Sequence, residues 1–204
     1  SYPDLASLAY ALGENWEAAL VYVYKTSALE TRLATFSAAM GREISTLKNH
    51  NGPDECLFKT IMLLNPDVPI FYRGRMFASL QAIGDEIEQK LPEKDTSIID
   101  LVKSGCLKIY MEQKGIDKKI IERIEYVGAQ FTLEKYEYYY ALLYLLNRNY
   151  TYSDKFSDMK SLCDYLESLS DEERESFSKT LVYDRLFHMW VFSKGYGKQL
   201  REWL

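Results

Sequence analysis

Hydrophobic side chains recur along most of this chain of 204 residues at the three- and four-residue spacing that is typical of α-helices. Glycine, proline and clusters of polar residues interrupt the pattern, and such residues mark the ends of helices. Gly13 is expected to end a first short helix, and Ser170 and Glu173 have the spacing of a capping box at the start of another. The longer predicted helices cover residues 15–41, 79–91, 97–113, 117–127 and 132–146. We therefore expect a mainly all-α fold.

Two short segments of the chain depart from the helical spacing. Residues 68–77 read VPIFYRGRMF, in which β-branched and aromatic residues surround Arg73 and Gly74. This composition predicts a small hairpin or an extended connector between two helices. The segment 150–159 stands in the same place in the second half of the chain. Any β-strand is therefore expected to be confined to these two connectors.

The order of elements around the first connector is repeated around the second. Leu63, Leu64 and Asn65 precede the first connector, and the same three residues recur 82 positions later, before the second. Further matched pairs follow at offsets of 82 or 80 residues: Ser79 and Ser161, Leu80 and Leu162, Leu101 and Leu181, Lys114 and Lys194, and Gly115 and Gly195. This shared order indicates an internal duplication, because a fixed period is the sequence signature of repeat proteins.

The duplication predicts two tandem helical repeat units of roughly 75–80 residues, each with a short hairpin or extended connector between helices. The first unit covers residues 53–130 and the second covers residues 131–204. Residues 1–52 form N-terminal helices, which are either a separate segment or the tail of a preceding unit. The unit is too long for a tetratricopeptide repeat and lacks the Trp-x-x-Leu-Gly pattern of that family, so no family resemblance is assigned.

Composition and charge restrict the classes of protein to which the chain can belong. It is 47% hydrophobic, which is enough for a real core, and its net charge of −5 disfavours binding to nucleic acid or to an anionic membrane. Its longest apolar runs, 18–24 and 138–146, are shorter than the roughly 20 residues that cross a bilayer. Three widely spaced cysteines, Cys56, Cys106 and Cys163, suit a reducing compartment and are expected to be buried. We therefore predict a cytoplasmic location.

Motifs for enzymatic chemistry are missing from the sequence. It has no glycine-rich phosphate loop, no EF-hand loop and no zinc spacing among its cysteines. The two histidines are His50, in a polar loop, and His188, in the apolar run LFHMWVF, where a hydrogen-bonded core histidine is more common than a general base. Neither follows a glutamate at the spacing that a di-iron bundle requires. We predict no catalytic, cofactor-binding or metal-binding residues, and no cofactor.

Arg73 and Arg75 flank Gly74 at the tip of the first connector. Two guanidinium groups at a turn could bind a carboxylate or a phosphate. The simpler interpretation is that they keep the edge of a hairpin soluble, since only Lys155 stands at this place in the second unit. The basic run 114–123 is interpreted in a similar way, as the solvated face of an amphipathic helix.

Tyrosine is unusually frequent, with 17 residues, and seven of them lie between positions 136 and 152. One helix face cannot cover the three consecutive tyrosines at 138–140, so we expect Tyr138 to be exposed and Tyr144 to be buried. Binding surfaces favour tyrosine because it gives a large contact area at a low entropic cost. The predicted interaction surface consists of Tyr136, Tyr138, Tyr140, Arg73 and Arg75. The alternative is that these rings pack in the core.

The pattern as a whole favours a non-catalytic helical repeat module that mediates protein–protein interaction and belongs to a larger protein. Stacked helical units present an extended face, and such folds usually work through that face. The expected partner is a protein or a neighbouring domain of the same chain, and neither nucleic acid nor a membrane. The alternative is an enzyme or a small-ligand-binding domain with a pocket between the two repeat units, near Arg73, Arg75 and His188.

Overall fold

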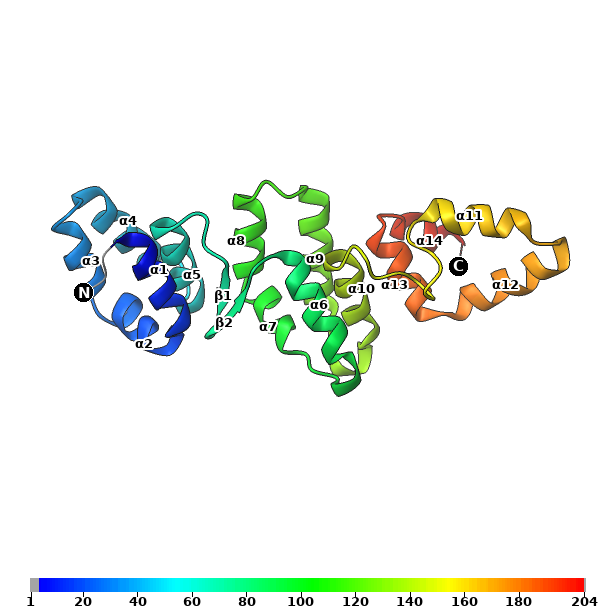
Figure 1. Ribbon diagram of the computed structural model, residues 1–204, viewed down its shortest axis with the longest axis horizontal. Coiled ribbons are helices and arrows are strands. Elements are labelled where there is room, and N and C mark those ends of the chain that lie inside the picture. Colours follow the sequence, from blue (N-terminus) through cyan, green and yellow to red (C-terminus); the bar gives the residue numbers. More distant parts are fainter. Residues whose placement is uncertain (1–3, 204) are drawn as a thin grey trace. The chain divides into compact units, whose positions relative to one another are not determined.

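The computed structural model describes residues 4–203, and these residues form a mainly α-helical structure (Figure 1). The predicted all-α fold class is therefore confirmed. The chain divides into two compact units, each of which is described separately below. The first contains the residues up to Ser79 together with Asp100–Ile116, and the second contains Leu80–Ile99 together with the residues from Asp117 onward. Helix α7 (Ser97–Lys103) crosses the division between them.

The first unit is built around helix α5, because seven of its twelve residues are buried. Helices α1, α4 and α8 pack against α5. The elements of this unit are α1 (Leu5–Glu14), α2 (Trp16–Leu20), the π-helical turn η1 (Val21–Lys25), α3 (Ala28–Ala34), α4 (Ala38–His50), α5 (Pro53–Leu64), β1 (Ile70–Tyr72), β2 (Arg75–Phe77) and α8 (Cys106–Gln113).

The first connector forms the predicted hairpin. Strands β1 and β2 pair antiparallel, with Tyr72 opposite Arg75, and the two-residue turn at Arg73 and Gly74 has positive φ at both positions. Such a turn matches the twist of the paired strands. In the second connector Tyr152 and Phe156 form a single bridge, so β-structure among the described residues is confined to the two connectors, as predicted.

Three of the predicted helices have wrong boundaries. Gly13 lies inside α1 instead of ending it, because the missing side chain makes room for the ring of Phe71; a Cβ atom there would lie 2.3 Å from that ring. The predicted helix 15–41 is broken at Thr26, whose hydroxyl bonds the carbonyl of Tyr22, and at Ser37, which caps α4. Such hydroxyls offer backbone groups an alternative to the helix.

The third wrong boundary lies in the predicted helix 97–113, which is divided into α7 and α8. The break is at Gly105, whose φ of 80° belongs to the left-handed region. The Ser104 hydroxyl donates to the carbonyl of Leu101 and accepts from the amide of Cys106. Glycine adopts this conformation without steric cost, so a single residue suffices to separate the two helices.

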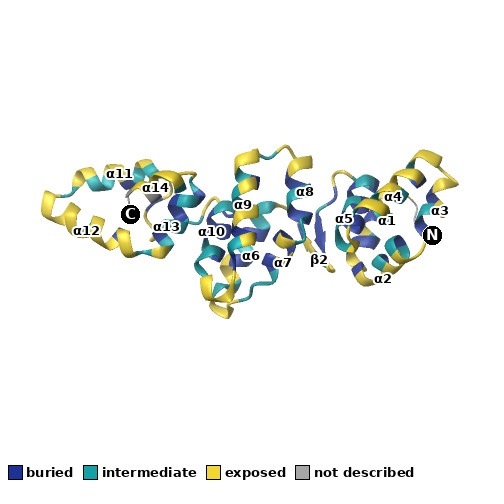
Figure 2. Cartoon of the chain, turned by 180° about the vertical axis from the view of Figure 1, so that it is seen from behind, coloured by how far each residue is buried: buried dark blue, intermediate teal, exposed yellow. Residues whose placement is uncertain are grey.

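The second unit is built around helix α10, against which α6, α9 and α13 pack. Helix α12 lies largely in solvent, with only Leu181 buried (Figure 2). The predicted capping box at Ser170 and Glu173 is confirmed at its start. The elements of this unit are α6 (Leu80–Lys90), η2 (Leu91–Glu93), α9 (Lys118–Gln130), η3 (Leu133–Lys135), α10 (Glu137–Leu146), α11 (Met159–Ser168), α12 (Asp171–Tyr183), α13 (Arg185–Ser193) and α14 (Gly197–Trp203).

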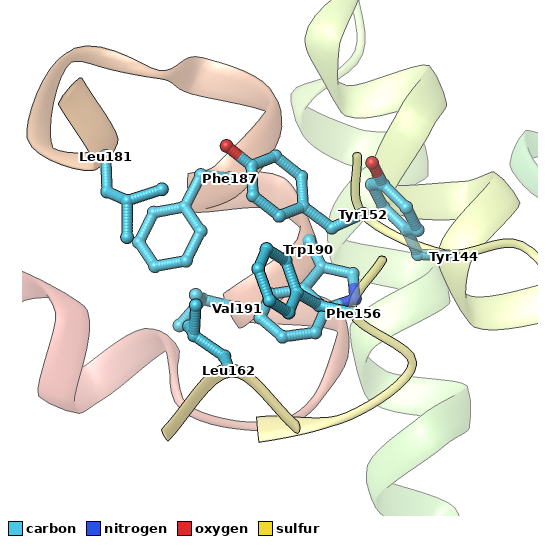
Figure 3. Close-up of a cluster of buried hydrophobic side chains, with 8 residues drawn as sticks. All are labelled: Tyr144, Tyr152, Phe156, Leu162, Leu181, Phe187, Trp190 and Val191. Atoms are coloured by element: carbon cyan, nitrogen blue, oxygen red, sulfur yellow. The ribbon is translucent and has the colours of Figure 1, made fainter. Parts of the chain in front are cut away.

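An aromatic cluster forms one part of the core of the second unit (Figure 3). Its buried members are Tyr144, Tyr152, Phe156, Leu162, Leu181, Phe187, Trp190 and Val191. The predicted burial of Tyr144 is confirmed. The Tyr152 hydroxyl donates to the Asp184 carboxylate at 2.5 Å, and that carboxylate also caps helix α13. This bond ties the second connector to the start of α13.

The two connectors share local geometry. Asn65 ends α5 and Asn147 ends α10, and each side-chain oxygen accepts from the amide two residues later, at 3.1 and 3.0 Å. Tyr72 is buried like Tyr152, and its hydroxyl donates to the carbonyl of Asp100 at 3.3 Å. These similarities accord with the predicted duplication, which itself stays a prediction. The match is incomplete, since Leu80 is only half-buried whereas its predicted counterpart Leu162 is buried.

Candidate functional site

A groove with a volume of about 430 Å³ lies in the second unit, between helices α9, α10 and α13 and the start of α14. We call it the aromatic groove, because tyrosine and phenylalanine rings form much of its wall. The described residues that line it are Arg123, Tyr126, Tyr138, His188, Met189, Phe192, Gly195, Gly197 and Lys198. This volume lies within the range of about 300–1,000 Å³ that is usual for ligand sites.

Amphipathic helices position the lining side chains. In α9 the buried face carries Ile121, Ile124 and Val127, which leaves Arg123 and Tyr126 beside it and on the groove. In α13 the buried face carries Phe187, Trp190 and Val191, and the intervening His188, Met189 and Phe192 line the groove. The helical period therefore makes each of these helices contribute one face to the core and a second face to the groove.

The aromatic wall is partly open to solvent. The ring of Tyr126 lies 5.4 Å from that of Phe192 and 6.3 Å from that of Tyr138, measured between centroids. Tyr126 remains 46% exposed. Burial raises the pKa of Tyr138, and a hydrogen bond with Tyr126 acts in the same direction. A guest side chain that entered the groove would contact ring surface that now faces water.

The polar groups of the groove are mostly basic. Arg123 donates from Nη1 to the carbonyl of Ser193 at 2.6 Å and from Nε to the carbonyl of Lys119 at 3.0 Å. Loss of solvation lowers the pKa of this half-buried guanidinium, and the Asp117 carboxylate at the start of the same helix acts in the opposite direction without forming an ion pair. His188 also lines the groove, and its buried Nε2 has no hydrogen-bond partner among the described residues. None of the described lining residues is acidic.

Only one residue of the predicted interaction surface lines this groove. Tyr138 does so, and it is half-buried instead of fully exposed. Tyr136 and Tyr140 are half-buried as well and contact each other, with ring centroids 6.1 Å apart. Tyr140 also packs against the aromatic cluster.

The predicted arginines Arg73 and Arg75 belong to the first unit and are engaged there. Arg73 forms an ion pair with Asp54 at 3.2 Å, and its guanidinium lies over the ring of Tyr72. Arg75 lies over the ring of Phe77, 5.0 Å from its centroid. Both side chains therefore stabilise the hairpin and its surroundings, and neither lines the aromatic groove.

The first unit has a groove of its own, with a volume of about 300 Å³, between α4, α5 and α8. We call it the polar groove. Its described lining residues are Glu43, Leu47, Lys59, Met62, Leu63, Pro66, Ile109 and Gln113. Helices α4 and α9 both span thirteen residues and start 80 positions apart, and Glu43 is the sixth residue of α4 as Arg123 is of α9. At the same offset Ile109 in α8 corresponds to Met189 in α13.

A third cavity, of about 320 Å³, lies in the first unit between α1, α3 and α4. Leu5, Leu8 and Leu33 give it an apolar wall, and Met40 lies at its lining. Phe36 stands at its rim and is 81% exposed. The acidic Asp4 and the basic Arg32 balance its charge, so its polar groups favour neither an anion nor a cation.

Other chemistry has little support in the described part of the chain. Residues 4–203 contain no group of three or more His, Cys, Asp or Glu that could hold a metal ion. No described helix has both the length and the apolar character needed to cross a membrane. Burial raises the pKa of Cys106 to about 12, which makes the thiol unreactive. The expectation that all three cysteines are buried is wrong, because Cys163 is exposed on α11.

Comparison with known proteins adds no assignment. No family model matches the chain, and neither a curated protein nor a solved structure is significantly similar to it. The fold and the site therefore define the class alone: a mainly α-helical protein of two compact units, each with a groove between helices.

Proposed function

We propose that this chain is a non-catalytic helical module that binds a protein partner, or a neighbouring domain of its own chain, through the aromatic groove. The observation that carries the proposal is the partly open wall of Tyr126, Tyr138 and Phe192 around a cavity of about 430 Å³. Protein interfaces obtain most of their binding energy from a few bulky side chains that enter such cavities, and aromatic residues and arginine are enriched there.

The chemical character of the groove supports binding more than catalysis. Catalysis by a general base needs a titratable group oriented by a second group, and His188 has no such partner for its Nε2 among the described residues. Arg123 has its Nη1 and Nε bonded to backbone carbonyls, which fixes the guanidinium in place. A fixed cation beside exposed rings suits recognition of a partner side chain.

Selection from random peptide libraries tests this proposal. The full chain would be immobilised, and peptides would be displayed in separate libraries with free N-termini and with free C-termini. We expect selected peptides to share a bulky aromatic or aliphatic residue and to bind at least about tenfold more weakly to Tyr138→Ala, the scale of a truncated interface anchor. Thermal melting of the variant would verify that it folds.

The matched control is Leu63→Ala, which truncates a half-buried side chain that lines the polar groove. It should leave the affinity for the selected peptides unchanged, provided that melting shows the first unit to be folded. Failure to select any peptide, or equal affinity for the wild type and Tyr138→Ala, would contradict the proposal.

A second candidate, a small-molecule binding domain, is favoured by the volume of the same groove, which lies toward the lower end of the range for ligand sites. A thermal-shift screen of small aromatic compounds distinguishes it. Compounds that raise the melting temperature of the wild type but not of Tyr138→Ala would favour a small ligand. A screen without hits, alongside successful peptide selection, would favour a protein partner.

We also propose that the module works in the cytoplasm and binds neither nucleic acid nor membranes. Its three cysteines are unpaired, which suits a reducing compartment. Its net charge of −5 would repel the phosphates of nucleic acid and of anionic lipids. A gel-shift assay at low salt should show no binding to DNA or RNA, and a shift with either would contradict this part of the proposal.

A further inference from the structure

The geometry points to a specific occupant of the aromatic groove: an aromatic residue that carries a free α-carboxylate, at the C-terminus of a partner protein. This inference rests on the proposed function, because it names the chemical group that the groove would recognise. Three features of the groove lead to it: the basic character of its lining, the position of its rings and the short separation between the cation and the rings.

The lining selects for an anion. Arg123 and Lys198 bring positive charge to the lining, and none of the described lining residues is a carboxylate. This is unusual on a chain whose net charge is −5. The remaining N–H groups of Arg123 have no acceptor among the described residues, and the planar guanidinium matches a carboxylate with two parallel hydrogen bonds. The guanidinium of Arg123 lies against Gly195, where a Cβ atom would lie 3.1 Å from Nη1 and crowd it.

The rings select for an aromatic neighbour of that anion. Tyr126 lies beside both Phe192 and Tyr138, with centroid distances in the range of favourable ring pairs. Arg123 and Tyr126 are one helical turn apart on α9, so the cation and the rings stand on the same side of that helix. The flexible thioether of Met189 completes the wall and can adapt to a guest ring.

The spacing of the cation and the rings places both groups on one residue. Arg123 and Tyr126 lie one helical turn apart, with about 5–6 Å between their Cβ atoms, so one guest residue can place its carboxylate at the guanidinium and its ring against the aromatic wall. In an extended peptide, neighbouring side chains point to opposite faces, so an aspartate next to an aromatic residue would point out of the groove. Only a C-terminal residue carries a carboxylate on the same Cα atom as its ring. Hence the chemistry favours a chain end over an internal acidic motif.

Fluorescence anisotropy with a matched pair of peptides tests the inference. The probe is a fluorescein-labelled peptide of sequence GSGSF with a free C-terminal carboxylate, and its partner is the same peptide with a C-terminal amide. We expect the acid to bind the full chain at least about tenfold more tightly than the amide, as one charge-assisted hydrogen-bonded pair would give. Equal affinities would overturn the inference.

Two variants and one control locate the effect. Arg123→Gln and Lys198→Gln should each reduce the ratio of the two affinities, with the larger reduction at Arg123. Lys119→Gln removes an exposed positive charge one turn away from Arg123 on α9 and outside the groove lining, so the ratio should stay unchanged. Because Arg123→Gln removes bonds to backbone carbonyls, Lys198→Gln serves as the variant that leaves the fold intact. If Lys119→Gln lowers the ratio of acid to amide affinity as much as Arg123→Gln does, the preference for the acid is general charge attraction, and the inference is overturned.

The same experiment separates the inference from the proposed function on which it rests. One outcome is that the wild type binds the acid and amide peptides with equal affinity, and that Tyr138→Ala weakens the binding of both equally. The groove would then bind peptides without recognising the carboxylate. If neither peptide binds and peptide selection also fails, both proposals are wrong. N-acetyl-phenylalanine carries the same ring and carboxylate, so we expect it to displace the peptide, whereas N-acetyl-phenylalanine amide should not. Equal displacement by the acid and by its amide would contradict recognition of the carboxylate.

Discussion

The aromatic groove of the second compact unit and the polar groove of the first compact unit both lie between helices, yet their linings differ. Arg123 and Met189 line one groove, whereas Glu43 and Ile109 line the other. In the polar groove Lys59 is bonded to Glu55 and to Asn51, both at 2.6 Å, so its charge is satisfied within α5 and its surroundings. Arg123 has only backbone carbonyl partners.

This difference separates what the fold provides from what the side chains provide. Packing a short helix such as α8 or α13 against two longer ones leaves a groove in either unit, whichever residues line it. Partly exposed rings and a cation in a lining without a described carboxylate convert one of the two grooves into a candidate site. The predictions below test whether the two units unfold independently and whether corresponding side chains contribute differently in each.

The largest expected effect comes from removing the core of one unit. Trp190 is completely buried in the aromatic cluster, so Trp190→Ala should lower the free energy of unfolding of the second unit by about 3–5 kcal/mol. Amide hydrogen exchange should accelerate in α10 and α13 and stay nearly unchanged in α1 and α5. Uniform acceleration in both units would show that they unfold together.

The loss of stability on replacing the asparagine at the end of the central helix should be larger in the second unit, at the end of α10, than in the first, at the end of α5. Asn147 is buried, accepts from Gln81 at 2.6 Å and donates to Glu88 at 2.8 Å, so Asn147→Ala should cost about 2 kcal/mol, because it removes several hydrogen bonds, one of them to a carboxylate. Asn65 is half-buried and accepts from the amide of Asp67 at 3.1 Å, so Asn65→Ala should cost about 1 kcal/mol or less. Denaturant unfolding would measure both losses, and equal losses would contradict the comparison.

The connector tyrosines give a smaller contrast. Tyr152 donates to a carboxylate, that of Asp184, so Tyr152→Phe should cost about 1.5 kcal/mol. Tyr72 donates to a backbone carbonyl at 3.3 Å, so Tyr72→Phe should cost about 0.5 kcal/mol. Each substitution keeps the ring in place, so the difference in the free energy of unfolding reports on the hydroxyl bonds. A larger loss for Tyr72→Phe would contradict the assigned acceptors.

The smallest expected effect is a loss of stability at alkaline pH, which is absent at neutral pH. Burial raises the pKa of Tyr144 and Tyr152 above the ordinary value of 10.0, and burial also raises that of Tyr72 in the first unit. The folded state therefore keeps these protons while the unfolded state loses them, so the stability is constant below about pH 10 and falls as the pH rises further. Tyr152→Phe should make this fall shallower in the second unit. The free energy of unfolding would be measured by denaturant unfolding between pH 8 and 11. An equally steep fall with pH in the wild type and in Tyr152→Phe would contradict the assigned burial.

Local signals in the sequence predicted much of the fold. Helical spacing, the hairpin around Arg73 and Gly74, and the capping box at Ser170 and Glu173 all depend on residues within a few positions of one another. The breaks at Ser37 and Gly105 were missed because the apolar pattern continues through them. There a single hydroxyl or a single left-handed glycine outweighs the helical period.

The candidate site was predicted only in part, for a physical reason. The clustering of tyrosines pointed to Tyr138, and the alternative hypothesis of a pocket between repeat units pointed to His188; both line the aromatic groove. Tyr126, Phe192 and Lys198 were missed, since the groove gathers residues from position 123 to position 198 and no local pattern encodes that approach. The basic run 114–123 contained a signal, because its last arginine lies next to a buried face.

Methionine methyl groups allow the central claim, that the aromatic groove is a binding site and the polar groove is not, to be tested within one molecule. Met189 lines the aromatic groove, Met62 the polar groove and Met40 the third cavity, while Met111 is fully buried and serves as an internal reference. With ¹³C-methyl-methionine labelling, titration with the GSGSF acid should shift the methyl signal of Met189 and leave those of Met62, Met40 and Met111 in place. A shift of Met62 as large as that of Met189, or no shift of Met189 at saturating peptide, would contradict the claim.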